Sequence, residues 1–145
     1  SSGPHSNGYT LIRKLFDGDK EIGKQLVEPT RIYVKEVMNL IKQVDVHGIA
    51  HITGGGLDNI NRINNNFQYV IDNPLPVPSV FDWLQKKGEV EDSEMYRTFN
   101  MGMGMIIIVN KNDAEKSVSI LGSDAQIIGS VRNGKGVEHS SLKTD

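Results

Sequence analysis

The most informative stretch of the chain runs Gly48-Ile49-Ala50-His51-Ile52-Thr53-Gly54-Gly55-Gly56 and continues into Leu57-Asp58-Asn59-Ile60. The first six residues read as a short buried strand. Three successive glycines then allow backbone conformations with positive φ, and a helix can begin directly after them. The stretch therefore predicts a strand, a glycine turn and a helix in direct succession.

On both sides of this stretch, the residue pattern alternates between helical and extended segments. Apolar spacing and capping residues predict helices near residues 9–16, 37–44, 79–88, 93–96 and 113–121. β-Branched and aromatic runs predict strands at 31–34, 67–71, 103–109 and 125–131. This alternation predicts a sheet covered by helices. The acidic residues at 17–21 and 89–94 are interpreted as solvated, turn-like surface.

Length and composition exclude several classes of protein. The 145 residues suit one domain, residues 1–145. The net charge of −2 argues against a nucleic-acid partner, and the absence of cysteine excludes disulfides and thiolate chemistry. No apolar run reaches the roughly 18 residues that span a membrane, so neither a membrane nor nucleic acid is an expected partner. A cytoplasmic location fits best, and the turn-rich start without Met suggests a piece of a longer polypeptide.

The glycine turn is a candidate anion site. Backbone N–H groups of Gly54, Gly55 and Gly56 can converge on a phosphate, with the positive end of the following helix behind them. Thr53 adds a hydroxyl, and His51 points to the same side of the strand as Thr53. The alternative is that the glycines serve only a tight turn and close packing.

A second candidate lies in His5-Ser6-Asn7-Gly8, where an imidazole, a hydroxyl and an amide precede a predicted helix. The alternative is a simple helix cap with an exposed histidine. No metal site is expected, because the four histidines lack ligand spacing.

Alternating glycines in Phe99-Asn100-Met101-Gly102-Met103-Gly104-Met105 indicate either close approach of a ligand or a bulge before an apolar strand. The methionines are interpreted as core residues rather than a cofactor box.

Taken together, four segments resemble the C-terminal domain of the phosphoribosylformylglycinamidine cyclo-ligase family, also called aminoimidazole ribonucleotide synthetases. The similarity rests on Ser-Ser-Gly-Pro-His-Ser-Asn-Gly-Tyr at 1–9, Pro-Thr-Arg-Ile-Tyr-Val-Lys at 29–35, Ile-Ala-His-Ile-Thr-Gly-Gly-Gly at 49–56, and Glu-Met-Tyr-Arg-Thr-Phe-Asn-Met-Gly-Met-Gly-Met at 94–105. The chain departs from the family pattern at 59–66, where Asn61 replaces a proline.

The resemblance implies an α/β (α+β) fold: a three-layer, partly ferredoxin-like domain with a mixed sheet and flanking helices. It also implies that this domain packs beside an N-terminal ATP-binding domain. That domain is missing from this chain, and it would supply most contacts to ATP and Mg²⁺. The complete enzyme would use formylglycinamidine ribonucleotide and ATP in purine biosynthesis and would be a homodimer. The fragment alone would be inactive, with apolar surface uncovered near His5 and residues 101–105.

Within that family, His5 and His51 are the expected catalytic residues. The expected substrate- or phosphate-binding residues are Ser6, Asn7, Thr53, Gly54, Gly55, Gly56, Asn100 and Gly102. Two alternatives stay open: another ATP-dependent enzyme of the same superfamily, such as a selenophosphate synthetase or thiamine monophosphate kinase, and a non-catalytic ligand-binding or dimerisation module.

Overall fold

The computed structural model describes residues 1–5 and 7–140. Its α-helices are α1 (Tyr9–Leu15), α2 (Lys20–Leu26), α3 (Val34–Ile41), α4 (Ser79–Gly88), α5 (Asp92–Thr98) and α6 (Ala114–Leu121), with 3₁₀ turns η1 (Gly56–Arg62) and η2 (Lys111–Asp113). Its strands are β1 (Val46–His51), β2 (Phe67–Ile71), β3 (Met105–Val109), β4 (Gly129–Asn133) and β5 (Gly136–His139). The expected α+β class is confirmed.

The strands form two small sheets rather than the single mixed sheet that the sequence suggested. β1 pairs antiparallel with β3, with Ile49 opposite Ile107 and His51 opposite Met105. β2 lies between β4, to which it is antiparallel, and β5, to which it is parallel. The second sheet is therefore mixed, whereas the first is a two-stranded ribbon.

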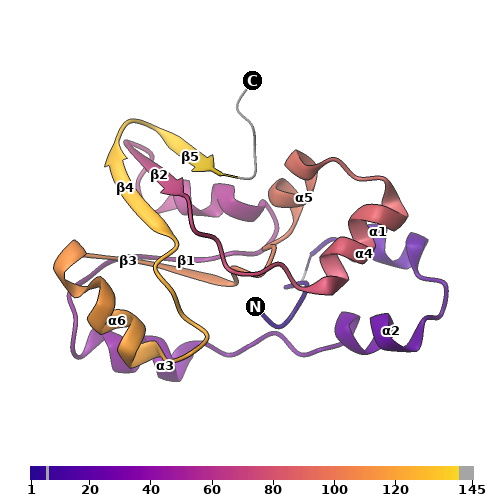
Figure 1. Ribbon diagram of the computed structural model, residues 1–145, viewed down its shortest axis with the longest axis horizontal. Helices are drawn as coiled ribbons and strands as arrows, with labels where there is room; N and C mark the ends of the chain where they lie inside the picture. Colours follow the sequence, from indigo (N-terminus) through magenta and orange to yellow (C-terminus); the bar gives the residue numbers. More distant parts are fainter. Residues whose placement is uncertain (6, 141–145) are drawn as a thin grey trace.

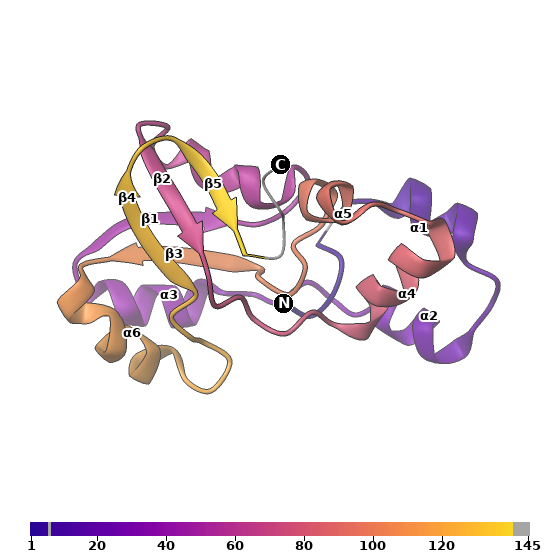
Figure 2. The same cartoon turned by 45° about the horizontal axis from the view of Figure 1, so that its top comes forward.

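The elements lie in layers at one end of the molecule and in a helical group at the other. Helices α3 and α6 lie on one side of β1 and β3, and the β4-β2-β5 sheet lies on the other (Figures 1 and 2). Helices α1, α2 and α4 form the opposite end, and the N-terminus lies between the two groups. The first residues of the chain are thereby placed beside the segment that precedes β3.

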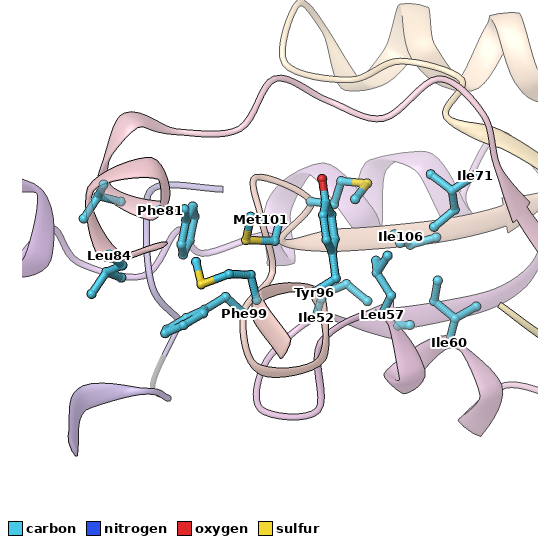
Figure 3. Close-up of a cluster of buried hydrophobic side chains, with 14 of the residues drawn as sticks. Ile52, Leu57, Ile60, Ile71, Phe81, Leu84, Tyr96, Phe99, Met101 and Ile106 are labelled. Carbon is cyan, nitrogen blue, oxygen red and sulfur yellow. The ribbon is translucent and has the colours of Figure 1, made fainter. Parts of the chain in front are cut away.

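One continuous core connects the helical end to the sheets (Figure 3). Phe81 of α4 packs against Phe99, with ring centroids 5.6 Å apart. Toward the sheets, the core continues through Ile52 and Ile106. Met101 and Met103 are 4% and 1% exposed, so both are core residues as expected. Burial of a large apolar side chain contributes about 1.5–3 kcal/mol, so this cluster is the main source of stability.

Several expected elements differ in the structure. Helix α2 lies where solvated turns were expected, because the Asp19 side chain caps it by accepting hydrogen bonds from the N–H groups of Glu21 and Ile22. No strand forms at 31–34; α3 begins at Val34 instead. The helix expected after the glycines is the 3₁₀ turn η1.

The last part of the chain also departs from expectation. β4 lies later than the strand expected at 125–131, and β5 was not expected. β5 is short, and its pairing with β2 is a tertiary contact that local sequence does not encode. None of the helices in the described residues is long and apolar enough to cross a membrane.

Candidate functional site

His5 lies in the segment before α1 and is completely buried. Neither ring nitrogen has a hydrogen-bond partner among the described residues. Burial, reinforced by the nearby charge of His51, lowers the pKa of His5 to about 4. At neutral pH its imidazole is uncharged, with one nitrogen that donates and one that accepts. Because neither the donor nor the acceptor nitrogen has a partner, this buried ring can bind a polar group of a ligand.

His51 is the last residue of β1 and is exposed. Its ring centroid lies 5.6 Å from that of His5. The next residue, Ile52, is fully buried, and its N–H donates to the Gly104 carbonyl at 2.9 Å. This burial pattern is consistent with the expectation that His51 and half-buried Thr53 share the opposite side of the extended chain.

Tyr33 contributes a third ring that sequence reasoning missed. Its ring centroid lies 6.1 Å from that of His5 and 6.0 Å from that of His51. The buried hydroxyl has no hydrogen-bond partner among the described residues. Burial raises the pKa of Tyr33, so the phenol stays protonated. The sequence pattern places Tyr33 in an extended run at 31–34, and no local signal connects it to the two histidines.

Gly104 provides the space in which these rings meet. A Cβ at this position would overlap the Tyr33 hydroxyl and would lie 2.6 Å from His5 Cε1. The second of the alternating glycines therefore permits close approach of side chains that belong to the site.

The glycine turn lies beside this cluster. A Cβ on Gly54 would be 3.5 Å from the Asn7 Cβ, which places Asn7 against the turn. Gly55 has a φ of 95° and is exposed, and Gly56 packs so closely on the Tyr96 carbonyl that a Cβ would overlap it. Gly56 thus has a packing role, whereas the nearest atom to a Cβ on Gly55 would be Asn59 Nδ2, in ordinary contact at 3.6 Å.

Asn59 holds the turn in shape. Its side-chain amide donates to the carbonyl oxygens of Gly54 and Gly56 at 3.2 and 2.7 Å. The N–H groups of Gly54 and Gly55 find no acceptor within residues 1–5 and 7–140. The buried Asn59 Oδ1 is also unpaired there. The turn therefore offers free N–H donors in a fixed loop.

Asn100 joins the two segments that carry the site. Its Oδ1 accepts from the Ser1 hydroxyl at 2.6 Å and from the Gly102 N–H at 3.0 Å, and its Nδ2 donates to the Gly3 carbonyl at 2.8 Å. A Cβ on Gly102 would be 2.5 Å from the Pro76 carbonyl oxygen. Both residues hold the loop together, and their expected contacts with substrate stay predictions.

Two further expectations concern burial and coverage. The surface near His5 and residues 101–105 is not left uncovered: His5, Met101 and Met103 are 0%, 4% and 1% exposed. That expectation was wrong, because the core and the N-terminal segment cover these side chains from within the domain. Ser6, expected to bind phosphate, lies outside the described residues.

The described residues contain no group of three or more His, Asp or Glu side chains that could hold a metal ion. A cavity of about 1020 Å³ lies next to the cluster, between α3, α6, β3 and the segment that leads into β4. Arg31 and Tyr33 lie on its wall, and the Tyr33 ring centroid is 6.1 Å from that of His5.

The sequence profile of the family described as "AIR synthase related protein, C-terminal domain" matches residues 1–140. The chain belongs to this family. The match covers every described residue, including His5, Tyr33, His51 and the glycine turn.

Three curated relatives carry the name phosphoribosylformylglycinamidine cyclo-ligase. The chain is 44% identical over 149 residues to the phosphoribosylformylglycinamidine cyclo-ligase of Methanopyrus kandleri, and it is 44% and 46% identical to the proteins of the same name from Methanosarcina acetivorans and Methanosarcina mazei. These alignments cover 94%, 90% and 90% of the chain. They cover only 43%, 42% and 42% of the relatives, so the chain spans less than half the length of each.

A solved structure shares the fold of this AIR synthase related domain. The crystal structure of E. coli HypE, a hydrogenase maturation protein, superposes with a TM-score of 0.65 at 21% identity. It covers 97% of this chain, and the chain covers 45% of HypE. At this identity the likeness describes the fold alone.

Proposed function

We propose that this chain is the C-terminal domain of an ATP-dependent cyclo-ligase, which closes the imidazole ring of formylglycinamidine ribonucleotide to give aminoimidazole ribonucleotide. The observation that carries the proposal is the 44% identity to cyclo-ligases over nearly the whole chain. The geometry of the site also supports the proposal. The His5 ring has no hydrogen-bond partner among the described residues, and its centroid lies 5.6 Å from that of His51, beside the glycine turn.

The reaction proceeds in two steps. The amide oxygen derived from the formyl group attacks the γ-phosphorus of ATP, and ADP leaves. The amidine nitrogen then attacks the activated carbon, a C–N bond forms, the C–O bond breaks with release of phosphate, and the nitrogen loses a proton. Such a reaction gains most from fixed orientation and from groups that bind oxyanions.

The domain offers groups for both tasks. Neutral His5 and exposed His51 are placed to orient the amidine or to accept its proton. The N–H groups of Gly54 and Gly55, which have no acceptor among the described residues, are placed to hold a phosphate, and Thr53 adjoins them. Asn7 lies against this turn, where its side-chain amide nitrogen donates to the Thr98 carbonyl, and belongs to the same candidate site. Contacts of Ser6, Asn100, Gly56 and Gly102 with the ligand belong to the same proposal.

The partners of this domain are part of the proposal. ATP and Mg²⁺ are bound mainly by the preceding half of the polypeptide, as the resemblance to the cyclo-ligases implies. That half packs against this domain, and the complete protein acts as a cytoplasmic homodimer.

The test is ATP-dependent formation of aminoimidazole ribonucleotide by the complete polypeptide. We expect turnover in the complete protein and none in the 145-residue chain. His51→Gln should reduce turnover, since it removes a ring of the site. His47→Gln is the matched control, because His47 is an exposed histidine on the same strand. Absence of product from the complete protein, or equal activity in both variants, would refute the proposal.

A further inference from the structure

We propose that the hydroxyl of Tyr33 binds the substrate directly, as the third polar group of the site formed by His5 and His51. This inference rests on the proposed function and extends it to a residue that the sequence did not single out. It follows from the contacts of the hydroxyl, the way its ring is held and the chemistry of its neighbours.

The hydroxyl of Tyr33 is buried and unused. Two other tyrosines satisfy their hydroxyls within the chain: Tyr69 donates to the Asn64 carbonyl at 2.8 Å, and Tyr9 donates to the Leu26 carbonyl at 3.2 Å. Tyr33 finds no such acceptor among the described residues. An unsatisfied buried polar group destabilises a fold, so a hydroxyl kept in this position indicates a partner from outside the domain.

The ring of Tyr33 is also supported by a charged side chain. The Arg31 guanidinium lies over it, 5.5 Å from the centroid. Arg31 in turn pairs with Asp124 at 2.8 Å and with Glu36 at 3.3 Å. Tyr33 is also the N-cap residue of α3, and its carbonyl accepts a hydrogen bond from the Val37 N–H at 3.0 Å, so the helix fixes its backbone. The hydroxyl is thereby aimed at Gly104 and His5 by a rigid support.

The chemistry around the hydroxyl favours an uncharged polar ligand group. The raised pKa of Tyr33 keeps it a hydrogen-bond donor, and the lowered pKa of His5 keeps that imidazole neutral. The positive charge of Arg31 is already paired with two carboxylates. The Tyr33 hydroxyl is a neutral donor, and the His5 imidazole offers one neutral donor and one neutral acceptor. These groups match an amide, whereas a phosphate is better matched by the N–H groups of the glycine turn.

The experiment compares Tyr33→Phe with Tyr69→Phe in the complete polypeptide. For Tyr33→Phe we expect a KM for formylglycinamidine ribonucleotide that is raised about 3- to 10-fold, as for one lost hydrogen bond, with an unchanged KM for ATP. Its melting temperature should be unchanged or higher, because the orphaned hydroxyl is gone while the ring stays. Tyr69→Phe should show the reverse: a lower melting temperature and unchanged kinetics.

The outcomes separate this inference from the proposed function. If the wild-type protein does not turn over, the proposed function fails, and the melting temperatures still test whether the hydroxyl has a structural partner. If the wild-type protein is active and Tyr33→Phe has wild-type kinetics, the role of Tyr33 is refuted. A lower melting temperature in Tyr33→Phe with unchanged KM assigns the hydroxyl to the fold and also refutes it.

Discussion

His5 and His51 lie with their ring centroids 5.6 Å apart, yet one is completely buried and the other is exposed. The two rings therefore lie next to each other at the boundary between the interior of the domain and its surface. The inner ring is shielded from water, and the outer ring is free to meet a ligand. The stability of the chain should depend on pH through the inner ring.

The pKa of His5 predicts the direction of that dependence. In the unfolded chain its pKa returns to the ordinary 6.5, against about 4 in the fold. The unfolded state therefore takes up a proton first as pH falls. The free energy of unfolding is therefore unaffected by His5 above pH 6.5. It falls by on the order of 3 kcal/mol as the pH drops from 6.5 to about 4.

Urea unfolding of the chain between pH 4 and 7.5 measures this effect. His5→Gln should reduce the dependence of the free energy of unfolding on pH. Burial also lowers the pKa of His139, so the remainder should persist in that variant. An identical slope in wild type and His5→Gln would contradict the assignment.

Gly55→Ala tests the glycine turn as an anion site. With φ at 95°, any side chain is strained, although the nearest atom to a Cβ, Asn59 Nδ2, is 3.6 Å away. The strain should cost about 1–2 kcal/mol of stability. If the Cβ or the displaced N–H groups disturb a bound phosphate, affinity of the complete protein for the phosphorylated substrate or ATP falls roughly 10- to 150-fold.

Gly18→Ala is the matched control. Gly18 has a φ of 92°, no atom within 4 Å of its Cβ position, and no contact with the site. Both variants should lose similar stability in thermal unfolding, and only Gly55→Ala should lose affinity in calorimetric titration. Equal affinity in both variants would assign the turn a structural role.

Gly104→Ala should destabilise the domain by about 1–3 kcal/mol, because the added methyl group overlaps the Tyr33 hydroxyl and crowds His5. Adding Tyr33→Phe removes the overlapping atom and should restore part of that loss. A double-mutant cycle from urea unfolding measures the coupling. Strict additivity would show that the methyl group and the hydroxyl do not meet.

Asn100→Ala removes three hydrogen bonds and leaves the Gly3 carbonyl and the Gly102 N–H without their partner. We expect a loss of about 2–3 kcal/mol in the free energy of unfolding. Asn110→Ala, which removes an exposed cap on η2, should cost about 1 kcal/mol or less. A smaller loss at Asn100 than at Asn110 would be incompatible with the structure.

Local pattern accounts for the strand, the glycine turn and the apolar helices, since each is encoded within a few residues. It fails where tertiary contacts override propensity. The β-branched run around Tyr33 leads into a helix because α3 packs against α6 there. Lys87, in the last turn of α4, pairs with Asp17 at 2.5 Å, a contact across 70 residues of sequence that no local pattern indicates. The histidines were found from their motifs, whereas Tyr33 joins them only through the folded chain.

The Asn100 junction has a consequence for how the domain is synthesised. Its side chain bonds residues 97 and 99 positions earlier in the chain, and β1 pairs with a strand more than fifty residues later. Contacts of such long range form late, after most of the chain has collapsed. His5 is thus surrounded by its neighbours only after residue 104 has left the ribosome. A chain that ends before this residue cannot form the site.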